Sequence, residues 1–319
     1  MPMTLGAQRK TTRYIVISPV RNELQYLGQT IRSMVNQTIR PVQWVLVDDG
    51  SSDGTAEVID YWASKHTWIL PIHRPDRDRR VQGPGSHKNE FAGEARPNRG
   101  KRACEAKEIE AFLDGYMRIT VLDWEFLVKI DGDIGFERDY FEKCFNKFDT
   151  DRKLGIGGGV ICHQVKGRLK VEPSPRFHVR GATKIYRRTC WEQIGGVIRG
   201  TGWDTIDEVK ANMLGWSTCS FPDLKVVHYR HTGAANGAWR NAVKNGMWSY
   251  ISGYHPIFML VRCVKSLLRM PILVASVGLL WGFLLGYIRN IPQIDDRKLI
   301  QYLRQQQLRR LFLQRTIWK

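Results

Sequence analysis

The sequence predicts an α/β protein built around a parallel β-sheet, and two observations carry this prediction. Short apolar runs rich in β-branched residues, at 14–18 and 42–47, alternate with stretches whose apolar residues recur at helical spacing. This order of strand and helix is typical of parallel sheets with right-handed crossovers. Two of the apolar runs, 42–47 and 126–130, also end directly in aspartates. Because such sheets bind ligands at the carboxyl ends of their strands, we expect these aspartates in a binding site.

The composition is that of an ordinary globular protein, but the net charge is unusual. The 319 residues suffice for one large domain or for one domain with an appendage, and 43% of them are hydrophobic. A net charge of +18 favours an anionic partner: nucleic acid, a membrane surface or a phosphorylated substrate. The six cysteines are scattered without a CxxC pair, and the N-terminus has no signal-peptide pattern. These features predict reduced thiols in a cytosolic compartment and no zinc site.

Breaker residues and helical periods divide the first half of the chain. Pro19 closes the first strand, Pro41 precedes the second, and Ser52 or Asp53 is placed to cap the next helix. The stretch 73–102 is rich in Arg, Gly and Pro and has no period. It is either a long loop bordering the pocket or a solvated linker. The expected elements are strands 14–18, 42–47 and 126–130 and helices 24–35, 55–64 and 105–118.

The second half continues the α/β pattern to about residue 230. Three consecutive glycines, at 157–159, lie inside an expected strand. They do not form a GxGxxG motif, so they predict no cofactor. The expected elements are helices 139–148, 189–194 and 203–214 and strands 154–162 and 220–229.

From about residue 238 the chain becomes apolar, aromatic and basic. Residues 270–288 are 19 positions without a charge. At ~1.5 Å per residue such a helix reaches roughly across the apolar core of a bilayer. Pro271 and three glycines in this stretch also allow a re-entrant or interfacial helix, and a buried core helix is the remaining alternative. Residues 297–319 predict a basic, Gln-rich amphipathic helix that lies on anionic lipid.

The two aspartate-bearing strand ends suggest separate tasks. Asp131 and Asp133, with only Gly132 between them, are able to share a divalent cation, although a simple turn has the same pattern. Asp48 and Asp49 precede a small-residue turn and a helix start. A carboxylate there is able to accept N–H groups of a nucleobase, and the start of the helix suits phosphate.

A third acid is needed if a nucleophile is to lose a proton, and the expected helix 203–214 supplies candidates. Asp204, Asp207 and Glu208 lie at i, i+3 and i+4, on one helix face. Asp207 and Glu208 could equally solvate a surface helix, and Asp204 could be an N-cap. His228 is either a further metal ligand or a core histidine.

These residues carry a resemblance to a known family. YIVISPVRNE (14–23), VLVDDGSSDGT (45–55), KIDGDI (129–134) and an acidic helix ending in Gly-Trp resemble glycosyltransferase family 2, of the GT-A fold. The similarity spans 14–230. It implies a Rossmann-like nucleotide-diphospho-sugar transferase with a hydrophobic, membrane-associated helical C-terminus. We therefore divide the chain into a catalytic domain (1–237), a membrane-associated segment (238–290) and a basic tail helix (291–319).

The resemblance also implies roles for individual residues. It makes Asp131 and Asp133 the DxD motif that holds Mn²⁺ or Mg²⁺, with His228 as the further candidate ligand. Asp49 contacts the nucleobase in this reading. The nucleotide-sugar contacts implied together are Pro19, Arg21, Glu23, Asp49, Ser51 and Asp131.

The family's catalytic aspartate usually follows a Glu and precedes a Gly-aromatic pair by eleven residues. Counting back from Gly215 gives Asp204, but Trp203 stands in place of the Glu. Asp204 is thus the first candidate for the base, with Asp207 and Glu208 as alternatives. The Gln-x-x-Arg-Trp motif of processive synthases is not found after the last strand, because Trp239 and Arg240 reverse its final pair. One transfer per encounter is therefore expected.

The expected function is inverting, metal-dependent transfer of a sugar from a UDP-, GDP- or dTDP-sugar to a lipid-linked saccharide. RGATKIYRR (180–188), GWDTIDE (202–208) and GYHPIF (253–258) resemble a bacterial exopolysaccharide branch. This places the protein on the cytoplasmic face of the inner membrane, with membrane lipids as partners and no nucleic acid. Arg180 or Lys184 is expected near the departing diphosphate. Three alternatives are transfer to a polyprenyl phosphate, a nucleic-acid binder and a non-catalytic nucleotide-binding scaffold.

Overall fold

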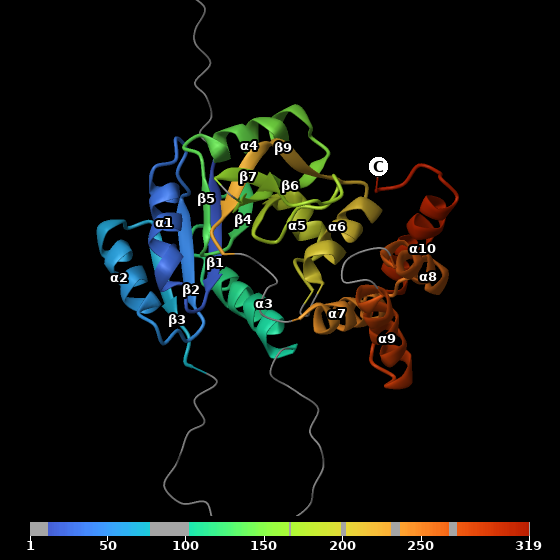
Figure 1. The fold of residues 1–319 in the computed structure, drawn as a ribbon. Coiled ribbons are helices and arrows are strands. Elements are labelled where there is room, and N and C mark those ends of the chain that lie inside the picture. Colours follow the sequence, from blue (N-terminus) through green and yellow to red (C-terminus); the bar gives the residue numbers. More distant parts are fainter. Residues whose placement is uncertain are drawn as a thin grey trace, which may run out of the picture.

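The computed structural model describes residues 12–76, 102–165, 167–198, 202–230, 237–267 and 273–318. Figure 1 shows a central sheet with helices packed around it and a group of helices from the C-terminal part of the chain at one side. Most of the stretch 73–102 and the start of 270–288 lie outside the described residues.

The elements of the first half are β1 (Tyr14–Val20), α1 (Leu24–Val35), β2 (Gln43–Asp48), α2 (Thr55–Lys65), β3 (Ile69–His73), α3 (Arg102–Tyr116), β4 (Phe126–Ile130), β5 (Ile134–Phe136) and α4 (Tyr140–Thr150). Those of the second half are β6 (Leu154–Val165), β7 (Arg168–Val171), β8 (Thr183–Arg187), α5 (Arg188–Ile194), α6 (Trp203–Met213), β9 (Ser217–His228), α7 (Ala238–Ile251), α8 (Pro256–Ser266), α9 (Val274–Ile288) and α10 (Arg297–Leu311).

The sheet has nine strands in the order β3-β2-β1-β4-β8-β6-β9-β5, and β7 pairs with β6. β3, β2, β1 and β4 are parallel, which confirms the prediction for the first half. Beyond β4 the sheet is mixed, because β8 runs antiparallel to both β4 and β6. The carboxyl ends of the four parallel strands therefore meet at one edge of the sheet, where both aspartate pairs were expected.

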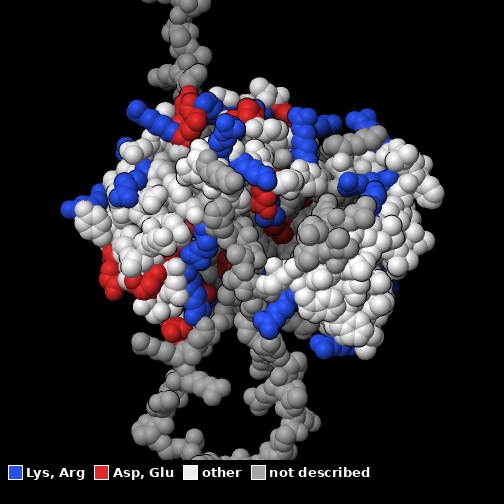
Figure 2. All heavy atoms as spheres, in the orientation of Figure 1, with Lys and Arg blue, Asp and Glu red and all other residues white. Residues whose placement is uncertain are grey.

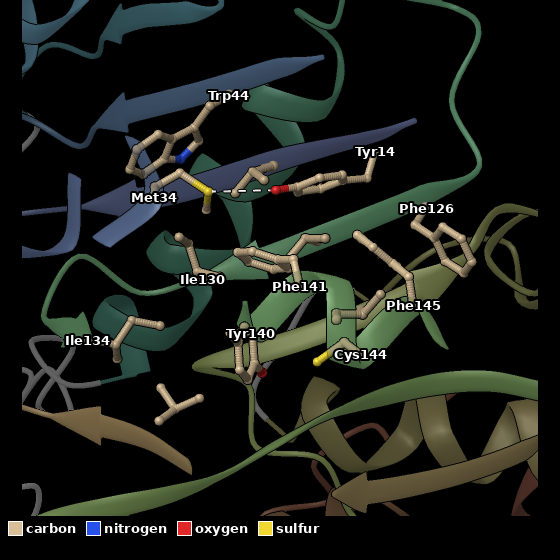
Figure 3. Close-up of a cluster of buried hydrophobic side chains, with 14 of the residues drawn as sticks. Tyr14, Met34, Trp44, Phe126, Ile130, Ile134, Tyr140, Phe141, Cys144 and Phe145 are labelled. Carbon is tan, nitrogen blue, oxygen red and sulfur yellow. Dashed lines mark hydrogen bonds between the residues drawn. The ribbon is translucent and has the colours of Figure 1, made fainter. Parts of the chain in front are cut away.

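Two hydrophobic cores form on opposite faces of the sheet because side chains alternate along each strand. Tyr14 and Val16 of β1 point into a core covered by α1 and α4, whereas Ile15 and Ile17 point into one covered by α3, α5 and α6. Figure 3 shows the first core, in which the Tyr14 hydroxyl lies 3.9 Å from Met34 Sδ. These cores hold the parallel strands rigidly under the site.

The uncharged stretch before residue 289 does not form one long helix. α9 has 15 residues, and no helix in the described ranges has the length and hydropathy that a membrane crossing needs. Its glycines serve close helix packing: a side chain at Gly282 would strike the Val243 carbonyl of α7, and one at Gly278 would crowd Ala242. The three predicted breaker glycines thus form the contact face between α9 and α7, whereas Pro271 lies outside the described residues.

α10 ends at Leu311, so the predicted helix 297–319 is shorter than expected. Its apolar side chains are also already covered, because Leu299 and Leu303 pack against Ile206 and Val209 of α6. An isolated amphipathic helix would leave such residues for a lipid surface, whereas here they join the C-terminal helices to the α/β domain. The proposed three-part division of the chain stays a prediction.

Candidate active site

The turn after β2 is tied to the start of α1 by short polar side chains. Asp53 accepts hydrogen bonds from the backbone N–H groups of Thr55 (3.0 Å) and Leu24 (3.1 Å), so one carboxylate serves the first turns of two helices. The N-cap position itself belongs to Gly54, whose φ of 98° suits glycine. Ser51 accepts the Asn22 backbone N–H at 3.0 Å. The two loops that end β1 and β2 therefore form one unit.

Asp49 lies at this edge and is almost fully buried. Its Oδ1 is 2.5 Å from Nη1 of Arg74, which directly follows β3, and Arg74 Nε is 2.9 Å from Asp114 Oδ2. The sequence analysis missed Arg74, because no local motif marks it. Pro19 and Arg21 flank the same edge on β1, and Arg21 pairs with Asp76 at 3.4 Å. The expected contact of Asp49 with a nucleobase stays a prediction.

Asp131 and Asp133 follow β4 as expected, and each has basic neighbours. Asp131 Oδ1 is 2.5 Å from Lys129 Nζ. Asp133 Oδ1 is 3.1 Å from His228 Nε2, and its Oδ2 is 3.5 Å from Arg230 Nε. Between them, a Cβ at Gly132 would lie 2.7 Å from Val20 Cγ1, so this residue must be small. Figure 2 shows acidic side chains in a recess of this face, with Lys and Arg around it.

We tested whether these residues fit a divalent cation. Among the described residues, no group of three or more His, Cys, Asp or Glu side chains is already arranged to hold a metal ion. The donor chemistry nevertheless fits Mn²⁺ or Mg²⁺, because Asp131 and Asp133 offer carboxylate oxygens. Burial and the charge of Asp133 raise the pKa of Glu23 to about 7, although Arg230 lowers it. This cluster therefore has negative charge that a cation would stabilise.

The three acids of α6 occupy different environments. The Asp204 side chain is 32% exposed, whereas those of Asp207 and Glu208 are 1% and 0% exposed. Asp207 accepts the Tyr186 hydroxyl at 2.6 Å, and burial raises the pKa of Asp207 to about 6 despite Lys184 at 3.1 Å. Of the three acids, Asp204 is the one that an acceptor could reach. Gly202, and not Asp204, is the N-cap of α6.

Two buried lysines link the strands beneath these acids. Lys129 of β4 and Lys184 of β8 are directly opposite in the antiparallel register, and their side chains are 1% and 0% exposed. Lys129 Nζ also pairs with Glu108 at 2.7 Å, and Lys184 Nζ pairs with Glu208 at 3.0 Å. Because Lys184 is enclosed, it is not placed to contact a diphosphate, and Arg180 is the remaining expectation.

Trp203, which replaces the family's usual Glu, lies against both lysines. Its ring centroid is 5.3 Å from Lys129 Nζ and 5.4 Å from Lys184 Nζ. Aromatic faces attract cations, most strongly where water is excluded. A Cβ at Gly181 would lie 2.9 Å from the Trp203 ring, so the neighbouring loop needs a glycine there. The tryptophan therefore has a structural role between β4, which precedes Asp131 and Asp133, and α6, which carries the three acids.

Comparison with known proteins shows which family part of the chain resembles. Residues 15–96 match the family model described as Glycosyl transferase family 2. This region of the chain, which is less than half of its length, is therefore similar to glycosyltransferase family 2. An uncharacterized glycosyltransferase of Haemophilus influenzae is 34% identical over 74 residues, 23% of this chain and 28% of that protein. The cholesterol galactosyltransferase of Borreliella burgdorferi is 23% identical over 198 residues, 58% of this chain and 45% of that protein. The chain thus spans less than half of either relative.

Solved structures show that this chain has a GT-A-like fold. The mannosyltransferase PcManGT from Pyrobaculum calidifontis, in complex with GDP-Man and Mn²⁺, matches with a TM-score of 0.53 at 19% identity, over 86% of this chain and 75% of that one. Residues 1–349 of Staphylococcus aureus TarS, in complex with UDP-GlcNAc, match with a TM-score of 0.50 at 15% identity, over 92% and 80%.

Removal of the buried lysine under α6 should destabilise the protein strongly. Lys184→Met leaves Asp207 buried without its cation and removes one of the two basic partners of Glu208, and breaking such a buried pair typically costs about 3–5 kcal/mol. Denaturant unfolding followed by circular dichroism measures this, and adding Asp207→Asn should recover part of the loss. Lys143→Met, at an exposed ion pair with Asp139, is the control with little expected effect. Equal stability of the two single variants would contradict the role given to Lys184.

Proposed function

We propose that the chain is an inverting glycosyltransferase that moves a sugar from a nucleoside diphosphate to a hydroxyl of a lipid-linked saccharide. The observation that carries this proposal is that Asp131 and Asp204 both lie near the side chain of Glu108. Burial and the charges of Asp131 and Asp204 raise the pKa of Glu108, which pairs with Lys129. A candidate cation site and an accessible carboxylate therefore both lie near Glu108, as the transfer requires.

The donor side of the proposal rests on the loops after β1 and β2. Asp49 would contact the base, and Pro19, Arg21, Glu23 and Ser51 would line the nucleotide. PcManGT and TarS were solved with GDP-Man and UDP-GlcNAc, which supports a nucleotide-sugar without choosing the base. The loops around Asn22 and Asp53 are already joined by hydrogen bonds, so this side of the site is preorganised.

In the proposed reaction Asp204 takes the proton of the acceptor hydroxyl. The acceptor oxygen then attacks the anomeric carbon from the face opposite the nucleotide, and the bond from that carbon to the diphosphate breaks. Asp131 and Asp133 would hold Mn²⁺ or Mg²⁺, which stabilises a diphosphate leaving group when bound. Arg21, Arg180 and Arg230 add positive charge near the departing oxygens.

The lipid-linked acceptor is supported by the exposed faces of α8 and α9. Ile257, Leu260 and Val264 are exposed at i, i+3 and i+7 on α8, and Val277, Trp281, Leu284 and Ile288 are exposed on α9. In Figure 2 this part of the molecule, at the lower right, carries few charged side chains. Two neighbouring helices with apolar outer faces suit the interface of a bilayer.

Basic side chains border this apolar surface. Arg262 and Lys265 are exposed on α8, and Arg289 is exposed at the end of α9. Such a border favours anionic lipid headgroups. We therefore place the protein on the cytoplasmic face of the inner membrane, with α8 and α9, and not α10, as the contact. A role in cell-surface polysaccharide synthesis belongs to the same proposal.

Donor binding should depend on a divalent cation and on Asp131 and Asp133, the two aspartates that follow β4. In the presence of Mn²⁺, the correct nucleotide-sugar at a hundred times its Kd should stabilise the protein by about 2.7 kcal/mol. A thermal-shift panel of UDP-, GDP- and dTDP-sugars, with and without Mn²⁺, measures this. Asp131→Ala and Asp133→Ala should abolish the Mn²⁺-dependent part, whereas Asp223→Ala, at an exposed ion pair with Lys147, should retain it. Normal Mn²⁺-dependent binding by either site variant would overturn the assignment.

Asp204→Asn should lower turnover by about 10²–10⁴-fold, because the amide cannot accept the acceptor's proton. Donor binding should stay unchanged, since Asp204 acts on the acceptor. The measurement is sugar transfer under single-turnover conditions, with Asp223→Asn as the matched control. Activity retained within tenfold would refute a base at Asp204 and would favour an acceptor that is already anionic, such as a polyprenyl phosphate.

Charged residues on the exposed faces of α8 and α9 should release the protein from lipid. Flotation with vesicles that contain anionic lipid should recover the wild-type protein, and Leu260→Asp with Trp281→Asp should lower the recovered fraction several-fold. Both side chains are exposed, so the fold should tolerate the change. The control is Met117→Asp with Leu122→Asp, which are exposed on the α/β domain. Equal flotation of both double variants would exclude this surface as the membrane contact.

A further inference from the structure

His178, in the loop between β7 and β8, lies between two acids of α6: Asp204, the first candidate for the base, and Glu208, one of the alternatives. Its Nδ1 is 2.8 Å from Glu208 Oε2. Its Nε2 is 3.9 Å from Asp204 Oδ2. The imidazole thus connects a wholly buried carboxylate with the accessible one. No motif near residue 178 points to this contact.

Glu208 is itself held firmly. Its Oε1 accepts the Val179 backbone N–H at 2.7 Å and lies 3.0 Å from Lys184 Nζ. Because these two contacts fix the Glu208 carboxylate, its Oε2 binds His178 Nδ1 from one direction only, and this sets the orientation of the ring. Because a carboxylate only accepts hydrogen bonds, Nδ1 must carry the proton, and Nε2 then faces Asp204.

The charges around the ring favour its protonated form. Burial lowers the pKa of His178, but the carboxylates of Glu208 and Asp204 outweigh this and raise it above its ordinary value, although Lys184 acts against them. An imidazolium has a proton on each nitrogen, so it donates to Glu208 and presents a positive charge to Asp204. At 3.9 Å the attraction to Asp204 is that of an ion pair without a direct hydrogen bond.

We propose that the Glu208–His178 pair positions the Asp204 carboxylate for the acceptor's proton. This inference rests on the proposed role of Asp204 as the base. Lys184 completes the arrangement, because its Nζ donates to the Asp204 backbone carbonyl at 2.5 Å. One end of Asp204 is thereby held through the main chain and the other through its carboxylate.

The proton balance is simple. The acceptor oxygen loses its proton to Asp204, and His178 keeps both of its protons throughout. His178 does not touch the sugar and is therefore a positioning residue. Its effect comes from the attraction between opposite charges, which holds the Asp204 carboxylate in place.

The test compares two replacements that each keep one half of the ring's contacts. The side-chain amide of His178→Asn stands in for Nδ1 and can still donate to Glu208, but nothing then faces Asp204. The amide of His178→Gln reaches the place of Nε2. We expect His178→Asn to lower kcat roughly ten- to a hundredfold with donor binding unchanged. The KM for the acceptor should change much less than kcat, because His178 does not touch the sugar.

His178→Gln should recover part of the kcat lost in His178→Asn, because it restores a donor near Asp204. A purely structural role predicts something else: lower thermal stability in both variants and no recovery of kcat in His178→Gln. Wild-type kcat in His178→Asn would overturn the proposal, as would a loss of kcat that His178→Gln does not recover.

A double-mutant cycle separates this inference from the proposed function. In an Asp204→Asn background, His178→Asn should have no further effect on kcat, because the two act through one carboxylate. If Asp204→Asn abolishes transfer but His178→Asn leaves it unchanged, the positioning pair fails and the base assignment stands. If Asp204→Asn retains transfer within tenfold, the base assignment and the pair both fail.

Discussion

The site depends on two lysines that the fold buries opposite each other. Lys129 and Lys184 are cross-strand partners on β4 and β8, where like charges repel and where water does not stabilise either ammonium group. Each lysine therefore needs carboxylates of its own. Lys129 takes Glu108 and Asp131, and Lys184 takes Asp207 and Glu208. The same contacts hold Asp131, which follows β4, and α6, which carries the candidate base Asp204. Neutralising the lysines therefore also sets the geometry of the site.

This constraint explains why the family's Glu is absent before Asp204. A carboxylate at position 203 would join an already acidic group, whereas the indole of Trp203 lies against both ammonium groups and fills the space between β4, β8 and α6. The tryptophan adds attraction to the cations without adding charge. The exchange of Glu for Trp203 therefore leaves enough negative charge in the site, since Glu108 and Glu208 already pair with the two lysines.

The sequence predicted what local patterns encode and missed what distant contacts create. The strands β1, β2 and β4, the aspartates at the ends of β2 and β4 and the α6 acids were predicted, because periodicity and motif lie within a few residues. The partners of those acids were not: Arg74 lies 25 positions from Asp49, and His178 lies 30 from Glu208. One local signal was available, since Lys129 is a lone charge in an apolar strand. The glycines of α9 were interpreted as breakers because their packing partner, α7, lies elsewhere in the sequence.

The C-terminal helices are joined to the base through α6. Leu299 and Leu303 of α10 pack on Ile206 and Val209, which lie beside the acids on the same helix as Asp204. Burial raises the pKa of Tyr254, and the charge of Asp204 raises it further, which indicates that the α7–α8 turn lies near the base. If α8 and α9 rest on lipid as proposed, this packing sets the height of Asp204 above the headgroups. A lipid-linked acceptor would then meet the base at a fixed distance from the bilayer, which favours one length of acceptor over others.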